Sequence, residues 1–312
     1  MPTLVLTPGD PTGIGPEITL KALQRLGEFP DTKFIVVGSV KALEATAKIL
    51  HLPLPQGDNI AYRAVEADLP GTVAYQAIDE AVKLIAAKEA DALVTGPISK
   101  RHLLDAGYKL PGHTEILEDL ARRYFNAPEA VAEMLFVYKK FRLLLLTRHI
   151  PLKDVPAALA APGAVARPLK ILIAHLRNKL GIEEPRIALL GLNPHAGEIG
   201  GEEEEKIFAP VMRAVNNVGA SKLEGPFAAD GFFRGFDPEN PGYDAVVAAY
   251  HDQGLIPFKL LAGYEAVNMT IGLPFLRTSV SHGTAEDIAG KGIANKLSLV
   301  AAIRAASDAV RA

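Results

Sequence analysis

Short apolar runs alternate with longer amphipathic stretches along most of the chain. Runs of buried-strand length and content occupy residues 3–6, 34–37, 92–94, 187–190, 245–249 and 266–270. Apolar residues recur at helical spacing in residues 16–26, 41–50, 75–90, 114–124, 164–180, 203–218 and 295–310. This rhythm predicts an α/β protein in which most strands run parallel.

The alternation changes between residues 132 and 147. Two apolar runs flank Lys139-Lys140 there, a pattern typical of an antiparallel hairpin. No flexible linker is present, so we expect a second domain inserted into the first. The sequence predicts two α/β/α lobes with mixed sheets and an active-site cleft between them. We expect one lobe of residues 1–125 with 275–312, and another of residues 126–274.

Three of the eight histidines follow short apolar runs. His149, His195 and His251 come after residues 143–146, 187–190 and 245–249. Ligands of parallel α/β sheets bind outside the carboxyl ends of the strands, so the three imidazoles are expected at one rim. Three imidazoles can hold one divalent metal and leave a coordination position for substrate. Asp252 and Gln253 are placed to orient the imidazole of His251.

Composition excludes several classes of protein. The chain has 312 residues, of which 49 % are hydrophobic and 22 % charged, with a net charge of −3 and no cysteine. Disulfides, thiolate nucleophiles and cysteine zinc sites are therefore excluded. No basic cluster indicates a nucleic-acid partner, and no apolar run could span a membrane. With no signal peptide, we expect a cytoplasmic protein. The acidic run 202–205 is interpreted as a solvated helix start.

Two further groups of residues suit an anionic substrate. His113 and Thr114 fall at a predicted helix N-terminus, where backbone N–H groups attract phosphate or carboxylate, although Thr114 could also cap that helix. The second group supplies a point charge, an amide and a guanidinium fork, from Lys259, Asn268 and Arg277 respectively. The glycine-rich segment 9–15 follows a strand but matches neither dinucleotide-binding nor P-loop patterns, so it is weak support for a Rossmann fold.

Several segments together resemble the 4-hydroxythreonine-4-phosphate dehydrogenase family. They occur in that family's order between residues 9 and 284. The most specific are Asn193-Pro194-His195-Ala196-Gly197-Glu198 and Tyr250-His251-Asp252-Gln253-Gly254. The others are Gly9-Asp10-Pro11, Gly15-Pro16-Glu17, Thr95-Gly96-Pro97, Pro111-Gly112-His113-Thr114-Glu115 and Arg277-Thr278-Ser279 with His282-Gly283-Thr284.

The resemblance implies a fold like that of isocitrate and isopropylmalate dehydrogenases, a homodimer with the active site at its interface, and a role in pyridoxal 5′-phosphate biosynthesis. It implies NAD or NADP as cofactor and one divalent ion per site, zinc, magnesium or cobalt. The metal ligands would be His149, His195 and His251, shared across the interface. The substrate ligands would be His113, Thr114, Lys259, Asn268 and Arg277.

The reaction expected on this basis is oxidation of a hydroxyl on a phosphorylated substrate. The ion would lower the pKa of the hydroxyl, and hydride would pass to nicotinamide, giving 2-amino-3-oxo-4-(phosphooxy)butanoate, which decarboxylates. Asp230 and Asp252 are the candidate general bases. No basic residue near a ribose 2′ position is identified, so NAD and NADP both stay open.

Two departures from the family pattern leave the substrate open. The loop after Glu198 is short, and Ser281 stands where an aspartate is common. A related dehydrogenase of threonate or erythronate phosphate, or of an aromatic dihydrodiol, is therefore an alternative. Two classes of protein that need no nicotinamide cofactor also stay open: a three-histidine metallohydrolase acting on a phosphate ester, and a non-catalytic phospholigand-binding or phosphotransacylase-like protein.

Overall fold

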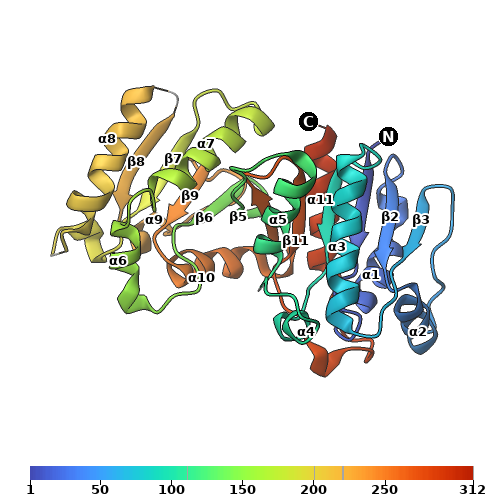
Figure 1. Cartoon of the computed structure of the whole chain (residues 1–312). Coiled ribbons are helices and arrows are strands. Elements are labelled where there is room, and N and C mark those ends of the chain that lie inside the picture. The colour runs from blue at the N-terminus through green and yellow to red at the C-terminus, as the bar shows by residue number, and fades with distance from the viewer. Residues whose placement is uncertain (111, 200, 220, 312) are drawn as a thin grey trace. The chain divides into compact units, whose positions relative to one another are not determined.

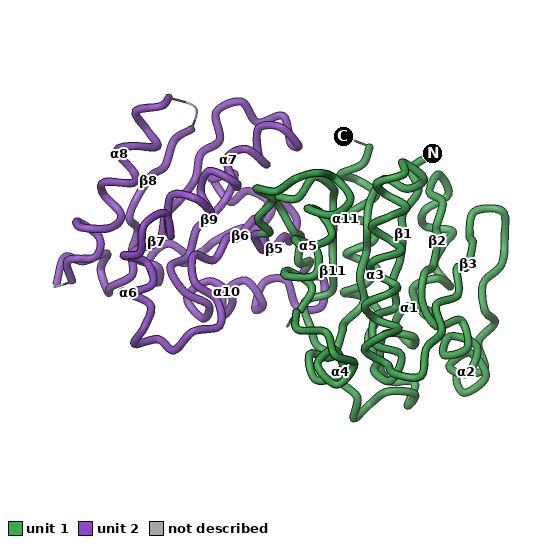
Figure 2. The backbone as a smooth tube through the Cα atoms, in the orientation of Figure 1, with its two compact units in different colours: residues 1–132, 267–312 green, residues 133–266 purple. Residues whose placement is uncertain are grey.

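The chain forms two compact units (Figure 2). The computed structural model describes residues 1–110, 112–199, 201–219 and 221–311. Unit 1 comprises residues 1–132 and 267–312, and unit 2 comprises residues 133–266. Unit 2 is therefore inserted into unit 1. The predicted second boundary, after residue 274, differs from this division because the strand Val267–Ile271 pairs with Leu276–Val280 in unit 1.

The strands of unit 1 are ordered β3-β2-β1-β4-β11-β10 (Figure 1). All neighbours are parallel except β10, which runs antiparallel to β11. Their bounds are β1 Thr3–Thr7, β2 Lys33–Gly38, β3 Ile60–Ala64, β4 Ala92–Thr95, β10 Val267–Ile271 and β11 Leu276–Val280. Because β1, β4 and β11 are parallel, the loops that follow them leave the same edge of the sheet.

Helices cover both faces of these strands. Helix α3 packs on β1, β2 and β4 and contacts α4 and α5, whereas α11 packs on β4, β10 and β11 and contacts α1. The bounds are α1 Gly15–Leu23, α2 Val40–Leu50, α3 Pro70–Ala86, α4 Lys100–Asp105, α5 His113–Phe125 and α11 Leu297–Arg311. In α3 the buried residues Ala74, Ala77, Ile78 and Ala81 recur at helical spacing, so one face enters the core.

The strands of unit 2 are ordered β5-β6-β9-β7-β8. The predicted hairpin is present as the antiparallel pair β5 and β6, and β6, β9, β7 and β8 run parallel. Their bounds are β5 Glu133–Tyr138, β6 Phe141–Leu145, β7 Arg186–Leu190, β8 Lys222–Phe227 and β9 Ala245–Ala248. Both units thus contain mixed sheets, and the predicted α/β class is confirmed.

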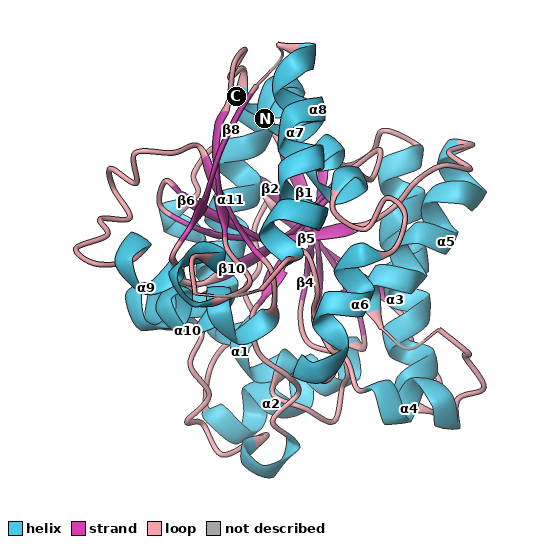
Figure 3. Cartoon of the chain, turned by 90° about the vertical axis from the view of Figure 1, so that its left-hand side faces the viewer, coloured by secondary structure: helices cyan, strands magenta, loops and turns pink. Residues whose placement is uncertain are grey.

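Helices and a cluster of aromatic side chains pack against the strands of unit 2. Helix α10 packs Leu255 and Phe258 against β6 and β9, and α9 lies beside it in both views (Figures 1 and 3). The bounds are α6 Val155–Ala160, α7 Ala166–Leu180, α8 Ala209–Val218, α9 Ala229–Phe232 and α10 His251–Ala262. The alternate residues Leu144, Leu189 and Val247 are also fully buried, so both strand faces are covered.

One predicted helix begins differently from its pattern. The stretch 203–218 starts with a π-helical turn, Glu204–Phe208, before α8. Glu204 and Phe208 are the buried residues of this turn, one above the other. The acidic run is therefore only partly solvated, and its interpretation as a wholly solvated helix start is wrong for Glu204. None of the helices in the described part of the chain combines the length and apolarity of a membrane span.

Candidate active site

The three histidine-bearing segments follow neighbouring parallel strands. β6 pairs with β9, and β9 pairs with β7, with all three strands parallel. His149 follows β6, His251 begins α10 directly after β9, and His195 lies in the turn after β7. The segments therefore leave the same edge of the unit 2 sheet. This arrangement is the one predicted from the apolar runs.

Two of the three imidazoles lie close together. The ring centroids of His149 and His251 are 5.7 Å apart, and the planes are inclined by 47°. Two imidazoles that bind one tetrahedral ion at about 2.1 Å have centroids roughly 5 Å apart. The pair therefore fits a divalent ion after a small adjustment of either ring. Imidazole nitrogen suits zinc and cobalt, so the chemistry of this pair also fits such an ion.

The imidazole of His251 is oriented by its neighbours. Its Nδ1 lies 2.7 Å from Oδ1 of Asp252, which leaves Nε2 as the nitrogen available to a metal. Gln253 accepts a hydrogen bond from the backbone N–H of Ala249 at 2.7 Å and donates one to the carbonyl of Gly191 at 2.5 Å. Gln253 thus ties the segment of His251 to the segment that leads to His195.

His195 lies in a 3₁₀ turn, Pro194–Gly197, and its side chain is exposed. Both His195 and Ala196 have φ of +54°, a left-handed conformation rare for residues with a Cβ. Within the described residues of this single chain, no three His, Asp or Glu side chains are grouped as a complete metal site. The predicted trio is therefore represented by the pair His149 and His251.

A cavity of about 270 Å³ lies beside this pair. It is lined by residues on both segments, namely Thr147, Arg148, His149, Ile150, Leu152, Val155, Tyr250, His251 and Asp252. Arg148 pairs with the buried carboxylate of Glu133 at 3.1 Å, which fixes the segment before His149. The two imidazoles thus border a space large enough for a small ligand.

Unit 1 contains a buried cationic centre at Arg277. Its guanidinium donates to the hydroxyl of Thr95 from Nε at 3.1 Å and from Nη2 at 2.7 Å, and to the hydroxyl of Thr270 from Nη1 at 3.0 Å. Burial lowers the pKa of Arg277 to about 9, so the group is still charged at neutral pH. No ion pair joins Arg277 to a carboxylate in the described part of the chain. A buried guanidinium without a counter-charge is suited to an anionic ligand.

His113 and Asn268 lie in the elements around Arg277. His113 is the first residue of α5, and burial together with the charge of Arg277 holds its pKa well below the usual value. Its Nε2 is buried without a hydrogen-bond partner among the described residues. Asn268 stands opposite Ser279 on β10, on the same strand face as Arg277. Thr114 follows His113 in the first turn; the N-cap is Gly112, so Thr114 does not cap the helix.

Lys259 and the candidate bases lie in unit 2. Lys259 is exposed on α10, two turns after His251. Asp230 is exposed on α9, which packs beside the turn of His195. Asp252 is the hydrogen-bond partner of His251. His113, Thr114, Asn268 and Arg277 are thus in unit 1, and the metal, lysine and aspartate candidates are in unit 2.

The glycine-rich turn 9–15 owes its glycines to close backbone packing. A Cβ at Gly15 or Gly96 would lie 2.0 or 2.1 Å from the carbonyl oxygen of Pro8. The buried carboxylate of Asp10 fixes this turn through the N–H and hydroxyl of Thr12 and through Nδ1 of His102 at 2.8 Å. His102 thus has a structural contact with this turn.

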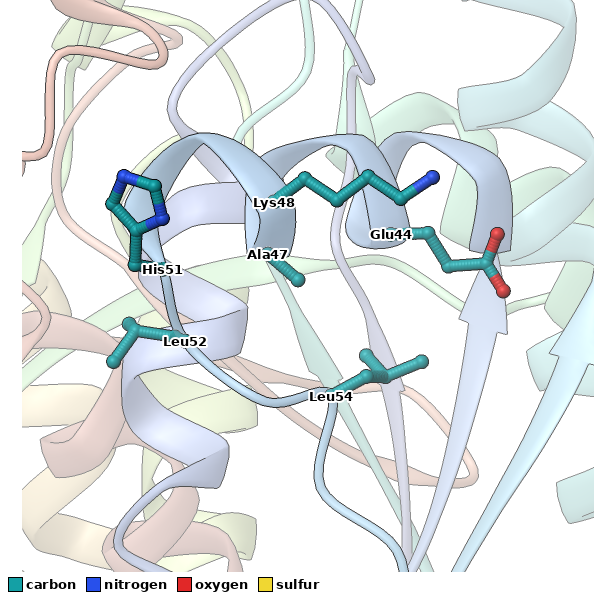
Figure 4. Close-up of a pocket in the computed structure, with 6 residues that line it drawn as sticks. All are labelled: Glu44, Ala47, Lys48, His51, Leu52 and Leu54. Carbon is teal, nitrogen blue, oxygen red and sulfur yellow. The ribbon is translucent and has the colours of Figure 1, made fainter.

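A larger hollow of about 760 Å³ lies on α2, away from these groups (Figure 4). It is lined by Glu44, Ala47, Lys48, His51, Leu52 and Leu54. Figure 4 shows Lys48 and Glu44 extending toward one end of this stretch and His51 lying at the other, so the imidazole does not join the two charged groups. The smaller cavity is the one bordered by the imidazoles of His149 and His251, and size alone does not identify a site.

Sequence reasoning missed three polar residues that hold the site. The hydroxyls of Thr95 and Thr270 accept hydrogen bonds from the guanidinium of Arg277. The carboxylate of Glu204 accepts a hydrogen bond from Asn193, beside the turn of His195. Thr95 belongs to a strand-ending Thr-Gly-Pro segment, a signal that could have drawn attention to it. Nothing in the acidic run distinguishes Glu204 from Glu205 until the π-helical turn places them on different faces.

The two units, each with a mixed sheet, define an α/β protein whose second unit is inserted into the first. Its structure resembles a β-decarboxylating dehydrogenase from Thermococcus kodakarensis, with a TM-score of 0.50, 14 % identity and coverage of 100 % of this chain and 84 % of that one. This likeness concerns the fold alone. The family model of pyridoxal phosphate biosynthetic protein PdxA matches residues 20–306. The chain belongs to this family, as its motifs predicted.

Relatives match over nearly the full length. A 4-hydroxythreonine-4-phosphate dehydrogenase from Synechocystis is 40 % identical, covering 99 % of this chain and 96 % of the relative. A D-threonate 4-phosphate dehydrogenase from Cupriavidus necator is 38 % identical, covering 99 % and 97 %. The solved structure of a 4-hydroxythreonine-4-phosphate dehydrogenase from Klebsiella pneumoniae has a TM-score of 0.84 and 32 % identity, covering 99 % of this chain and all of that one.

Proposed function

We propose that the chain is an NAD- or NADP-dependent dehydrogenase that oxidises 4-phosphohydroxy-L-threonine in pyridoxal 5′-phosphate biosynthesis. Hydride passes from the hydroxyl-bearing carbon to nicotinamide, and the hydroxyl proton passes to a base. The product, 2-amino-3-oxo-4-(phosphooxy)butanoate, loses carbon dioxide to give 3-amino-2-oxopropyl phosphate. Family membership and the names of the relatives support this reaction. We also place the enzyme in the cytoplasm, where cells hold their nicotinamide cofactors.

The observation that carries the proposal is the buried guanidinium of Arg277. Hydroxyls of Thr95 and Thr270 orient the fork, and no carboxylate neutralises it among the described residues. A phosphate or carboxylate of the substrate would supply the missing charge. Neutral His113 offers a buried Nε2 to the same ligand. Thr114, Asn268 and Lys259 complete the proposed substrate set and fix the reacting carbon.

His149 and His251 are proposed to hold one divalent ion per active site, zinc, magnesium or cobalt, together with His195. Such an ion, when bound, acts as a Lewis acid on the substrate hydroxyl. Asp252 fixes the ring of His251 and presents its Nε2. Because this hydrogen bond occupies Asp252, we propose that Asp230, on the helix beside the turn of His195, is the general base.

A homodimer would complete the trio across its interface. Helix α10 begins at His251 and carries the exposed apolar residues Ile256 and Leu260, and Tyr264 follows in the 3₁₀ turn after it. These three residues, the apolar stripe, are 58 %, 81 % and 65 % exposed. Exposed apolar side chains at i and i+4 on one helix face indicate a protein contact. A second copy of the chain on this stripe would bring its own strand-end residues toward the pair of His149 and His251.

A related substrate is the second candidate. The relative named D-threonate 4-phosphate dehydrogenase is 38 % identical over almost the whole chain, close to the 40 % of the first relative. The two substrates differ in bearing an amine or a hydroxyl beside the carboxylate. We would follow reduced nicotinamide by absorbance with each of them and with erythronate 4-phosphate, before and after treatment with a chelator. Turnover of the amino substrate that a chelator abolishes supports the proposal; no nicotinamide reduction with any of the three contradicts it.

A further inference from the structure

We propose that Glu204 is the positioning residue for His195. Its buried carboxylate holds Asn193 and so fixes the turn that presents the imidazole. This inference rests on the proposed metal site, since it concerns the orientation of one of the proposed ligands. Glu204 lies in a part of the chain whose composition indicated only a solvated acidic surface.

The carboxylate binds Asn193 twice. Oε1 accepts the backbone N–H of Asn193 at 2.8 Å, and Oε2 accepts the side-chain Nδ2 at 2.9 Å. The residue is only 7 % exposed and makes no ion pair among the described residues. A buried carboxylate needs strong hydrogen bonds to stay charged, and both of those found here come from the residue two positions before His195.

The turn that Glu204 holds is strained. His195 and Ala196 both have φ of +54°, and the turn is closed only by weak backbone bonds, from Ala196 N–H to Asn193 at 3.1 Å and from Glu198 N–H to His195 at 3.3 Å. Two successive side-chain-bearing residues in this conformation persist only when the surroundings impose it. Asn193, anchored at both its backbone and its side chain, provides a fixed start for the turn.

Glycines bring the carboxylate against the turn. A Cβ at Gly197 would lie 3.0 Å from Oε2 of Glu204, and a Cβ at Gly191 would lie 2.8 Å from Cα of Ala196. Gly191 also accepts the hydrogen bond from Gln253, two residues after His251. These contacts therefore pack together the side chain of Glu204, the turn of His195 and the start of α10.

The π-helical turn explains why Glu204 is the buried glutamate of the acidic run. Glu203 also accepts a hydrogen bond from Nδ2 of Asn193, at 2.9 Å, whereas Glu204 binds the backbone N–H of Asn193 as well. Glu204 and Phe208 are the buried residues of the turn Glu204–Phe208, and Phe208 has no exposed surface. Phe208 thus anchors the turn in the core, and the wider π geometry directs Glu204 at Asn193. Such turns are often found at functional sites. Glu205 is exposed, so it provides a control with the same charge change.

The test compares Glu204→Gln, Glu205→Gln and the reciprocal triple variant Asn193→Asp/Glu203→Gln/Glu204→Gln. In Glu204→Gln the amide nitrogen replaces Oε2 and meets the donor Nδ2 of Asn193, so one bond is lost. In the triple variant the carboxylate at position 193 accepts from the amides at positions 203 and 204, so both side-chain bonds are restored with exchanged roles. Cobalt binding would be followed by its visible spectrum, and amide exchange of residues 193–198 would be measured in the metal-free proteins.

We expect cobalt to bind at least ten-fold more weakly to Glu204→Gln, with an altered spectrum and faster exchange of the Ala196 amide. Glu205→Gln should stay within two-fold of the parent, and the triple variant should regain most of the lost affinity. Parent-like cobalt affinity and spectrum in Glu204→Gln would overturn the inference, whatever its thermal stability. If Glu204→Gln does not fold, a folded triple variant with a ten-fold cobalt defect would overturn it equally.

A failure of the proposed metal site can be distinguished from a failure of the proposed role of Glu204. If His195→Ala binds cobalt as tightly as the parent, His195 is not a ligand and the proposed metal set is wrong. Amide exchange in the metal-free Glu204→Gln protein then still reports whether Glu204 holds the turn. Unchanged exchange at Ala196 would contradict that part of the inference independently of any metal.

Discussion

The hydroxyl of Thr95 accepts hydrogen bonds from two nitrogens of Arg277, Nη2 at 2.7 Å and Nε at 3.1 Å. A neutral hydroxyl at the end of β4 thus occupies the place where a structural arginine would have a carboxylate. Thr95 also donates to Ser279 at 3.1 Å, so its lone pairs stay directed at the guanidinium. The arrangement orients the charge without neutralising it, which leaves the charge for a ligand.

Replacing Arg277 by Met should abolish substrate binding without loss of stability. The buried charge has hydroxyl partners but no ion-pair partner among the described residues, so the free energy of unfolding is expected to stay within about 1 kcal/mol of the parent or to rise. Urea unfolding with and without inorganic phosphate measures this, because an anion that binds only the native state stabilises it. Phosphate should stabilise the parent and leave the variant unchanged.

Arg142→Met is the matched control, since Arg142 is partly buried and donates to the backbone carbonyls of Lys140 and Asp244. We expect it to lose stability and to keep the response to phosphate. An Arg277→Met protein that phosphate still stabilises as much as the parent would show that the anion binds elsewhere.

Substitutions of Asp252 and Asp230 should affect different quantities, metal affinity and kcat respectively. Asp252→Ala is expected to weaken metal binding about 10- to 100-fold because the ring of His251 loses its partner, and Asp252→Asn, which keeps an acceptor, should weaken it less. Asp230→Asn should lower kcat about 100-fold or more while metal affinity stays the same. Steady-state kinetics at saturating metal and cobalt titration distinguish these effects. The reverse pattern would assign the base to Asp252.

A charge on the apolar stripe of α10 should disrupt the dimer. Leu260→Glu places a carboxylate at the most exposed of the three apolar positions, and we expect a monomer that has lost metal and activity together. Ile49→Glu, at a 59 % exposed position of α2 in unit 1, is the control and should leave the mass unchanged. Light scattering gives the masses. A Leu260→Glu protein with unaltered mass would remove α10 from the interface.

Unit 2 should lose stability in mild acid because of His175. Burial, with the nearby charges of Arg142 and Lys179, lowers the pKa of His175 to about 4 in the folded chain. Between pH 6.5 and 4 the unfolded chain binds a proton that the folded chain excludes, so stability falls as the pH falls through this window. The free energy of unfolding should fall by roughly 2 kcal/mol between pH 7 and pH 5, and this loss should disappear in His175→Gln. Urea unfolding at pH 7 and pH 5 tests it; an equal loss in both proteins would assign the effect to other groups.

Strand patterns and chain order made the fold predictable. Apolar runs at 143–146, 187–190 and 245–249 have the length of buried strands, and parallel pairing alone then places His149, His195 and His251 at one edge. The alternation broke where β5 and β6 form their hairpin, which located the inserted unit. The predictions of the α/β class, the strands and the hairpin were confirmed because they depend on period and sequence order, which a single chain displays.

The supporting residues of the site were not predictable in the same way. Thr95 acts through a contact with Arg277, 182 positions away. Thr270 and Glu204 contact Arg277 and Asn193, seven and eleven positions away, and all three residue types are common in strands and helices. The left-handed φ of His195 likewise has no residue-type signal, since glycine or asparagine would be expected there. Such positions depend on tertiary packing, and hydrophobic periodicity carries no information about them.

The most direct measurement is the coordination of the metal itself. We would load the protein with cobalt or zinc and combine X-ray absorption with anomalous diffraction at the metal edge. We expect one ion per active site with nitrogen ligands at about 2.1 Å, contributed by His149, His251 and His195. An ion located away from the pair of His149 and His251, or full turnover of 4-phosphohydroxy-L-threonine by a metal-free protein lacking these imidazoles, would contradict the proposed site.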